Sequence, residues 1–179
     1  MATPTSLPAS FSAGAVLTAA QMNDLRGAFR ILQVVSTNKT DTFGTTSTSF
    51  VDVTGLTVSI TPSSSSSKIL VAAFVNLGSL AGTNATYARL LRGSTAIAIG
   101  DAAGSRTQAS LAVEGAGAAS LPGTIIFVDS PSTTSSTTYK IQICTNGGGS
   151  AYVNRSDNDA DAAGRARLAS SITVLEISA

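Results

Sequence analysis

A short run of apolar residues set between turn-forming residues most limits the folds open to this chain. The segment 68–77 reads Lys-Ile-Leu-Val-Ala-Ala-Phe-Val-Asn-Leu, with Pro62 and a serine run before it and Gly78 after it. Runs this short with such flanks are typical of buried β-strands. Similar short runs, separated by Gly, Ser, Thr, Asn and Asp, occur at 55–61, 85–92, 124–129, 137–145 and 170–177. The pattern predicts an all-β protein.

The positions of the turn residues predict about ten strands between residues 31 and 179. Leu56, Val58 and Ile60 alternate with polar residues, which indicates an antiparallel sheet with one wet face. The sequence therefore predicts a jelly-roll-like antiparallel β-sandwich. Specific expectations are a first strand at 31–37, separate strands before and after Gly55, a connection without a strand at 116–122, a hairpin of 85–92 with 96–99, and pairing of 123–129 with 137–145.

Residues 1–30 differ from this pattern and predict a separate arm and short helix. Thr18 is a suitable N-cap, and Gln21 stands where it closes a capping box. Apolar residues at helical spacing follow. This stripe either packs beneath the chain's own β domain or docks on another subunit. A proline-bearing arm usually frays unless something holds it, which favours docking. The predicted anchors are Phe11, Leu17, Met22, Leu25 and Phe29.

Charged residues make up only 12% of the chain, about half the share usual in globular domains, and the net charge is +1. A subunit that buries much of its side wall against copies of itself needs few charges for solubility. We therefore predict a homo-oligomer or a part of a larger assembly; the alternative is a monomer coated with Ser and Thr. Eleven basic residues scattered among ten acidic ones form no basic patch, which argues against binding to nucleic acid.

The residue types present offer little for catalysis. The chain has no histidine, which removes the most common general base and most zinc sites. Asp157, Asp159 and Asp161 alternate as at the start of a calcium loop, but Ala162 and Leu168 stand where that loop needs Gly and Glu. The preferred interpretation is a solvated loop neutralised by arginines at 155, 165 and 167, and a weak Ca²⁺ or Mg²⁺ site is the alternative. We expect no catalytic residue, metal or cofactor; a glycan depolymerase using paired carboxylates is the enzymatic alternative.

The N-terminus gives no sign of membrane targeting. Phe11–Ala20 is short, is interrupted by Gly14 and lacks a basic flank, so it resembles neither a signal peptide nor a membrane span. The single cysteine, Cys144, allows no internal disulfide, so the fold does not depend on an oxidising compartment. Cys144 is expected to fill space near a strand end and to be inert. The sequence predicts assembly in a cytosol and no membrane insertion.

Several motifs resemble a family of viral proteins. The segment Ser12-Ala-Gly-Ala-Val-Leu-Thr-Ala-Ala-Gln-Met-Asn-Asp-Leu25 is similar to the N-terminal opening of many tailed-phage fibre and appendage proteins. Phe29–Val35, Ser59–Ser63, Ser67–Val71 and Tyr87–Arg92 look like small β-rich fibre or decoration proteins of phages that infect cyanobacteria and marine bacteria. The resemblance implies a virion appendage with a trimeric head similar to C1q or TNF-like jelly rolls.

These observations predict a non-enzymatic phage virion protein, assembled in the host cytoplasm. Residues 1–30 would attach to other virion proteins, of the tail, baseplate or capsid, and residues 31–179 would form a homotrimeric sandwich. The preferred role is a tail fibre or fibre tip that binds a host surface glycan or protein; the alternative is a capsid decoration or head-fibre protein. The predicted ligand-facing loop residues are Asn84, Arg106, Asn146, Asp157, Asp159 and Asp161.

Overall fold

The computed structural model describes residues 31–79, 84–115 and 119–178, together with Gly14, Val16, Thr18, Ala19 and Met22. Within these residues the chain forms eleven strands and no long helix. No helix of the described part is long and apolar enough to cross a membrane. The strands are β1 (Ile31–Lys39), β2 (Phe43–Thr45), β3 (Val51–Ile60), β4 (Lys68–Ser79), β5 (Ala85–Arg92), β6 (Thr95–Ile97), β7 (Leu111–Glu114), β8 (Ser120–Asp129), β9 (Thr137–Thr145), β10 (Ala151–Val153) and β11 (Ser170–Ile177).

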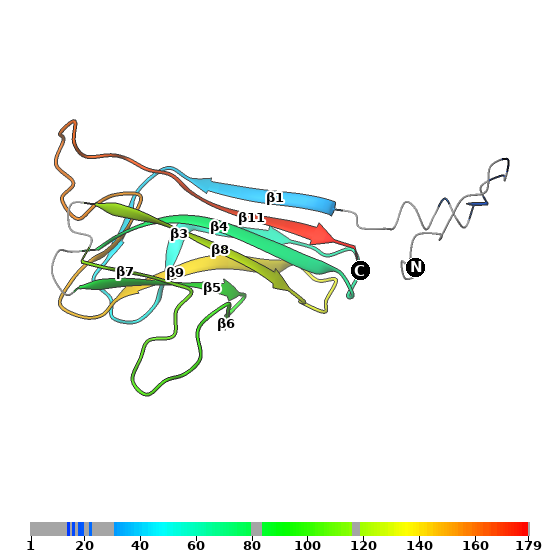
Figure 1. Cartoon of the computed structure of the whole chain (residues 1–179), viewed down its shortest axis with the longest axis horizontal. Helices are drawn as coiled ribbons and strands as arrows, with labels where there is room; N and C mark the ends of the chain where they lie inside the picture. Colours follow the sequence, from blue (N-terminus) through cyan, green and yellow to red (C-terminus); the bar gives the residue numbers. More distant parts are fainter. Residues whose placement is uncertain are drawn as a thin grey trace.

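The strands form two sheets, and every recorded pairing is antiparallel. In sheet A, β4 pairs along one side with β8 and along the other with β11 and then β10; β1 extends the sheet beyond β11, and β2 beyond β10. In sheet B the order is β3-β9-β5, with β6 and β7 both paired to β5. Figure 1 shows the strands running along the long axis of the molecule.

The pairing of the longer strands is nested along the chain. The first pairs with the last (β1 with β11), β3 with β9, β4 with β8, and β5 with β7. A long hairpin rolled into two sheets gives this arrangement, which is a jelly roll. The predicted all-β, jelly-roll-like antiparallel sandwich is confirmed.

The core lies between the sheets and follows from the period-two pattern of the strands. In β3, Leu56, Val58 and Ile60 are buried while the residues between them are exposed, as the alternation predicts. Other fully buried side chains include Ile69, Val71, Ile141, Ile143 and Ile172. Tyr139 is also buried, and its hydroxyl donates to Asp129 Oδ2 at 2.6 Å, which ties β9 of sheet B to the end of β8 in sheet A.

The predicted pairing of 123–129 with 137–145 is wrong. β8 pairs with β4 in sheet A, whereas β9 lies in sheet B between β3 and β5. The connection at 130–136 therefore passes from one sheet to the other. Both edges of β9 are occupied by other strands, so no hydrogen-bonding edge remains for β8.

Two predicted strand boundaries also change. The segments before and after Gly55 form one strand, β3, because Gly55 adopts a positive φ of 81° at a bulge where the register with β9 shifts. β8 begins at Ser120 and includes Pro122, which the sequence assigned to a connection. In the described residues β8 pairs only with β4, so the edge of the sheet accommodates a residue that has no N–H.

The start of β1 and the long connection between β10 and β11 lie at opposite ends of the sandwich. Ile31, where β1 starts, pairs with Ile177, near the end of β11. The long connection between β10 and β11, drawn in orange, lies at the opposite end of the molecule in Figure 1. The chain therefore enters the sandwich at one end and presents this connection at the other.

Candidate functional site

The predicted ligand-facing residues fall into two separate regions. Asn84 and Asn146 lie at the end opposite to Ile31, because Asn84 precedes β5 and Asn146 follows β9. The Asn146 side chain accepts a hydrogen bond from Ala85 N at 3.0 Å, and Asn146 N donates to Ala85 O at 3.2 Å. A Cβ on Gly149 would collide with the Asn84 side chain, so the loop after β9 lies directly against Asn84.

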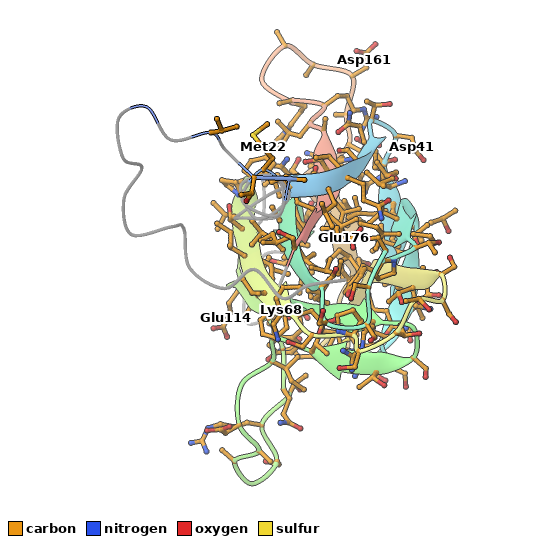
Figure 2. The ribbon with its side chains drawn as sticks, turned by 90° about the vertical axis from the view of Figure 1, so that its right-hand side faces the viewer. Met22, Asp41, Lys68, Glu114, Asp161 and Glu176 are labelled. Atoms are coloured by element: carbon orange, nitrogen blue, oxygen red, sulfur yellow. The ribbon has the colours of Figure 1, made fainter. Side chains whose placement is uncertain are left out.

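Asp157, Asp159 and Asp161 lie in the connection between β10 and β11, which we call the acidic loop (residues 155–169). Asp159 and Asp161 are exposed and Asp157 is half-buried. Figure 2 shows Asp161 at the outer tip of this loop. The acidic loop, Asn84 and Asn146 thus share one end of the sandwich.

Arg106 lies elsewhere. It is in the connection between β6 and β7, which projects on the side away from the acidic loop in both views. Gln108 Nε2 donates to Gly100 O at 2.7 Å, which links the two sides of this projection. The structure therefore does not bring Arg106 together with the other predicted loop residues.

Two of the three arginines that the sequence indicated, Arg155 and Arg167, pair with one carboxylate of the acidic loop, that of Asp159. The Arg155 guanidinium donates to Asp159 Oδ2 at 3.0 Å and to Asp157 O at 3.0 Å, and lies 4.2 Å from the centre of the Tyr152 ring. Arg167 pairs with the other carboxylate oxygen of Asp159. These hydrogen bonds, that of Arg167 above all, hold the pKa of Asp159 below its usual value. A general acid for glycan hydrolysis needs a raised pKa, so Asp159 does not suit that role.

The hollow beside this loop is small. It has a volume of about 190 Å³ and is lined by aspartates, arginines and small residues of the stretch 156–167. Ligand pockets usually measure roughly 300–1,000 Å³ and are mostly apolar. Among the described residues no cluster of three or more His, Cys, Asp or Glu could hold a metal ion. The loop is therefore suited to surface contact rather than to enclosing a small ligand.

A buried residue that the sequence did not single out anchors the acidic loop. Asn154 is fully buried and has a positive φ of 63°. Its Nδ2 donates to Lys39 O at 2.8 Å and to Asp41 O at 2.9 Å, and its Oδ1 accepts from Ser170 Oγ at 2.6 Å. Asn154 thereby connects the end of β1 with both ends of the loop. The only local signal is that Asn tolerates a left-handed backbone, and this does not reveal its distant partners.

Gly78 supports the same loop from β4. A Cβ at this position would collide with the carbonyl group of Arg155, so the loop backbone packs directly on the glycine. Gly149, which lies against Asn84, is buried like Gly78. Each lacks a side chain because another segment occupies that space.

Of the five predicted attachment residues, the structure describes Met22. Met22 N donates to Thr18 O at 3.0 Å, and Ala19 and Met22 are helical, which agrees with a helix that starts after Thr18. Met22 is 47% exposed. Phe11, Leu17, Leu25 and Phe29 lie outside the described residues.

Comparison with known proteins yields distant structural similarity alone. No protein-family model matches the chain, and no curated protein matches it. Two structures of infectious bursal disease virus, of the Gt and Gx strains, match 81% of this chain at 14% and 13% identity, with TM-scores of 0.43 and 0.41. A VP2 subviral particle of the same virus matches 82% at 15% identity, with a TM-score of 0.37. The matches span about two fifths of those longer chains. At these values the likeness adds nothing about function, and the assignment of a jelly roll rests on the strand pairing described above.

Proposed function

We propose that this chain is a non-enzymatic structural protein of a virus particle, a homotrimeric tail-fibre or fibre-tip appendage that binds a host surface. The observation that carries the proposal is the two-ended construction of the sandwich. The segment that precedes Ile31 joins the body at one end, while Asn84, Asn146 and the acidic loop lie at the other. The resemblance of the N-terminal sequence to phage fibre proteins agrees with attachment through residues 1–30.

The loop end has the properties of a contact surface. Asp161 and Asn146 are exposed, while Asn154 and Gly78 hold the loop bases to the sandwich. The exposed polar side chains of these loops would contact a host glycan or protein, and the sandwich would hold the loops in place. Three copies on one head add avidity, because the second and third contacts form at a high effective concentration. Weak contacts from each acidic loop can then give firm adhesion.

Localisation in intact particles tests this role. An antibody against the full-length chain, used with gold labelling of purified virions, should mark the distal end of the tail. Label on the shell would overturn the fibre assignment in favour of a capsid decoration or head-fibre protein. Absence of the chain from purified particles would overturn the virion assignment as a whole.

A second measurement tests the adhesive end. Excess full-length protein should slow adsorption of particles to host cells. The triple variant Asp157→Ala, Asp159→Ala, Asp161→Ala should compete less well, and the control Asp101→Ala, in the separate β6–β7 projection, should compete like the wild type. Equal competition by both variants would remove the acidic loop from the binding surface. Turnover of host polysaccharide by the wild type that the triple variant lacks would overturn the non-enzymatic assignment.

A further inference from the structure

All large exposed hydrophobic side chains in the described part of the β body belong to one sheet. They lie on β1, β4 and β8, which are neighbours or near neighbours in sheet A. Ile126 is 70% exposed, and Val34 and Val128 are 57% and 55% exposed. The full set is Ile31, Val34, Phe74, Leu121, Ile126 and Val128.

The strand registers line several of these residues up in rows across the sheet. Val34 pairs with Leu175, Leu175 with Leu70, and Leu70 with Val128. Because Ile69, Val71 and Ala73 of β4 are buried in the core, the alternate residues of this strand point outward. We call the outward rows of sheet A the apolar face; its members are Val34, Leu70, Ala72, Phe74, Ile126, Val128 and Leu175, with Ser36, Asn38, Thr124, Ser171 and Thr173 between them.

No charged side chain occurs among these twelve positions. The nearest in the register is Lys68, which lies beyond the row of Leu70 and donates to Ser130 Oγ at 2.8 Å. Isolated exposed hydrophobic residues are normal on proteins, but a continuous patch usually marks an interaction site.

The outward face of sheet B is built differently. Arg89 donates to Gln142 Oε1 at 2.9 and 2.8 Å, and Gln142 donates to Asp52 Oδ1 at 2.7 Å. Lys140 pairs with the other oxygen of Asp52 at 2.7 Å. This network crosses β5, β9 and β3 and suits contact with water. The contrast identifies sheet A as the side of the sandwich that remains to be covered.

The sequence of the central strands agrees with such a cover. β4 contains an unbroken apolar run from Ile69 to Val75, and β8 contains one from Ile125 to Val128. Strands buried on both faces have continuous runs, whereas strands with one wet face alternate, as β3 does. In a single copy of the chain one side of each run is exposed.

We propose that the apolar face is the interface with a second copy of this chain. The chemistry of the face favours this partner, because a second copy presents the same apolar surface. Four strands about 4.8 Å apart and rows that span five residues of each strand at about 3.4 Å each give a projected area of roughly 330 Å². A standard interface buries about 800 Å² on each partner, so the face would form the central part of a larger contact between the two copies.

The short helix predicted within residues 1–30 is too small to cover the whole face. A helix from 18 to 29 would be about 18 Å long and about 10 Å wide. It would cover roughly 180 Å², about half of the face. An uncharged face also requires a partner of equally low charge, and a second copy presents one. The inference rests on the proposed homo-oligomeric head and assigns the surface through which that head forms.

Light scattering of the full-length chain and of two matched double variants tests the interface. Ile126→Lys with Val128→Lys places two charges on the apolar face at exposed positions, where they leave the core unchanged. Thr54→Lys with Ser59→Lys places two charges on exposed positions of β3 in sheet B. The wild type and the sheet B variant should have the mass of the oligomer, three chains for the proposed trimer. The sheet A variant should have the mass of one chain and keep its β-sheet circular dichroism.

A milder substitution covers the case in which two lysines disturb folding. Ile126→Ser should weaken self-association about tenfold or more, as expected for a side chain central to an interface, with an unchanged circular dichroism spectrum. A wild type with the mass of one chain, or a folded sheet A variant with the mass of the oligomer, would overturn the proposal. Dissociation of both lysine variants would also overturn it, because the effect would not depend on the face.

The outcome is separable from that of the proposed function. A single-chain mass together with label on virions would remove the interface and keep the virion role. An oligomer that depends on Ile126 but is absent from particles would keep the interface and remove the virion role.

Discussion

At the scale of single residues, the sandwich contains charged groups that are buried with specific partners. Glu176 is fully buried in β11. Gln33 Nε2 donates to it at 2.6 Å, and the backbone N and hydroxyl of Ser63 each donate at 2.7 Å. Burial, the strongest influence, raises the pKa of Glu176, but the hydrogen bonds from Gln33 and Ser63 outweigh it, so the pKa lies below its usual value. The ionised carboxylate therefore fastens the serine-rich connection after β3 to sheet A.

Glu176→Gln should lower the free energy of unfolding at neutral pH by about 1–3 kcal/mol, because in either orientation its amide NH₂ would face a donor, the Ser63 groups or Gln33 Nε2. The folded-state pKa is depressed, so the stabilisation is present above the unfolded-state pKa of about 4.3 and is lost as the pH falls through the folded-state value. Urea unfolding of both proteins across this range should show the difference shrinking in acid.

Glu114→Gln is the control for this prediction, since Glu114 is exposed on β7 and lies at the surface in Figure 2, away from Glu176. It should leave unfolding unchanged at neutral pH. A Glu176→Gln protein as stable as the wild type at pH 7 would mean that the buried carboxylate contributes nothing through its charge.

At the scale of elements, the bulge in β3 depends on one backbone conformation. Gly55 has a φ of 81°, and a Cβ there would have its nearest neighbour, Lys39 Nζ, 3.8 Å away. Space is therefore available, and only the backbone angle opposes a side chain. Gly55→Ala should lower stability by about 1–2 kcal/mol.

The matched control for Gly55→Ala is Gly100→Ala. Gly100 is not one of the glycines with a positive φ, and a Cβ at this position would have no atom within 4 Å. Thermal unfolding should show a lower midpoint for Gly55→Ala alone. Equal midpoints for the two variants would show that β3 does not need the left-handed angle.

The acidic loop depends in the same way on its anchor. Asn154→Gly keeps the positive φ accessible but removes the bonds to Lys39 O, Asp41 O and Ser170 Oγ. Amide exchange in residues 155–169 should become faster, because the loop loses its connections to β1 and β11. Asn158→Ala, at an exposed position within the loop, should change exchange only near Ala160, whose N–H it binds. Unchanged protection in Asn154→Gly would assign the order of the loop to the arginine–aspartate pairs instead.

At the scale of the whole molecule, the distribution of charge gives the sandwich two unlike sides. Sheet B carries the Arg89–Gln142–Asp52–Lys140 network, and sheet A presents the apolar face. An oligomer that forms through an uncharged face should be insensitive to ionic strength, since salt screens only charge–charge interactions.

The oligomer mass should therefore stay the same between about 0.1 M and about 1 M NaCl, where the Debye length falls from roughly 10 to 3 Å. Sedimentation equilibrium at both concentrations measures this. Dissociation at the higher concentration would assign the association to ion pairs and would contradict the apolar interface.

Much of the fold was predictable from local patterns. The runs near 85–92, 137–145 and 170–177 are strands β5, β9 and β11, because alternation and turn residues act within a few positions of one another. The acidic loop and its neutralising arginines at 155 and 167 were also predictable, since opposite charges stood close in sequence. The prediction that β8 pairs with β9 was wrong, because the order of two strands along the chain does not decide which sheet each strand joins.

The sequence alone determined the class of protein: a β-rich chain without histidine, low in charge, with turn residues at short intervals. It also determined that β4 and β8 have apolar side chains on both sides over part of their length, because their runs at 69–75 and 125–128 are unbroken. Only the tertiary structure decided that these two strands are neighbours and turn one side of each run outward on the same sheet. The physical reason is that strands pair in the arrangement that closes both sheets around one core. This arrangement brings together residues more than a hundred positions apart, such as Lys39 with Asn154 and Gln33 with Glu176.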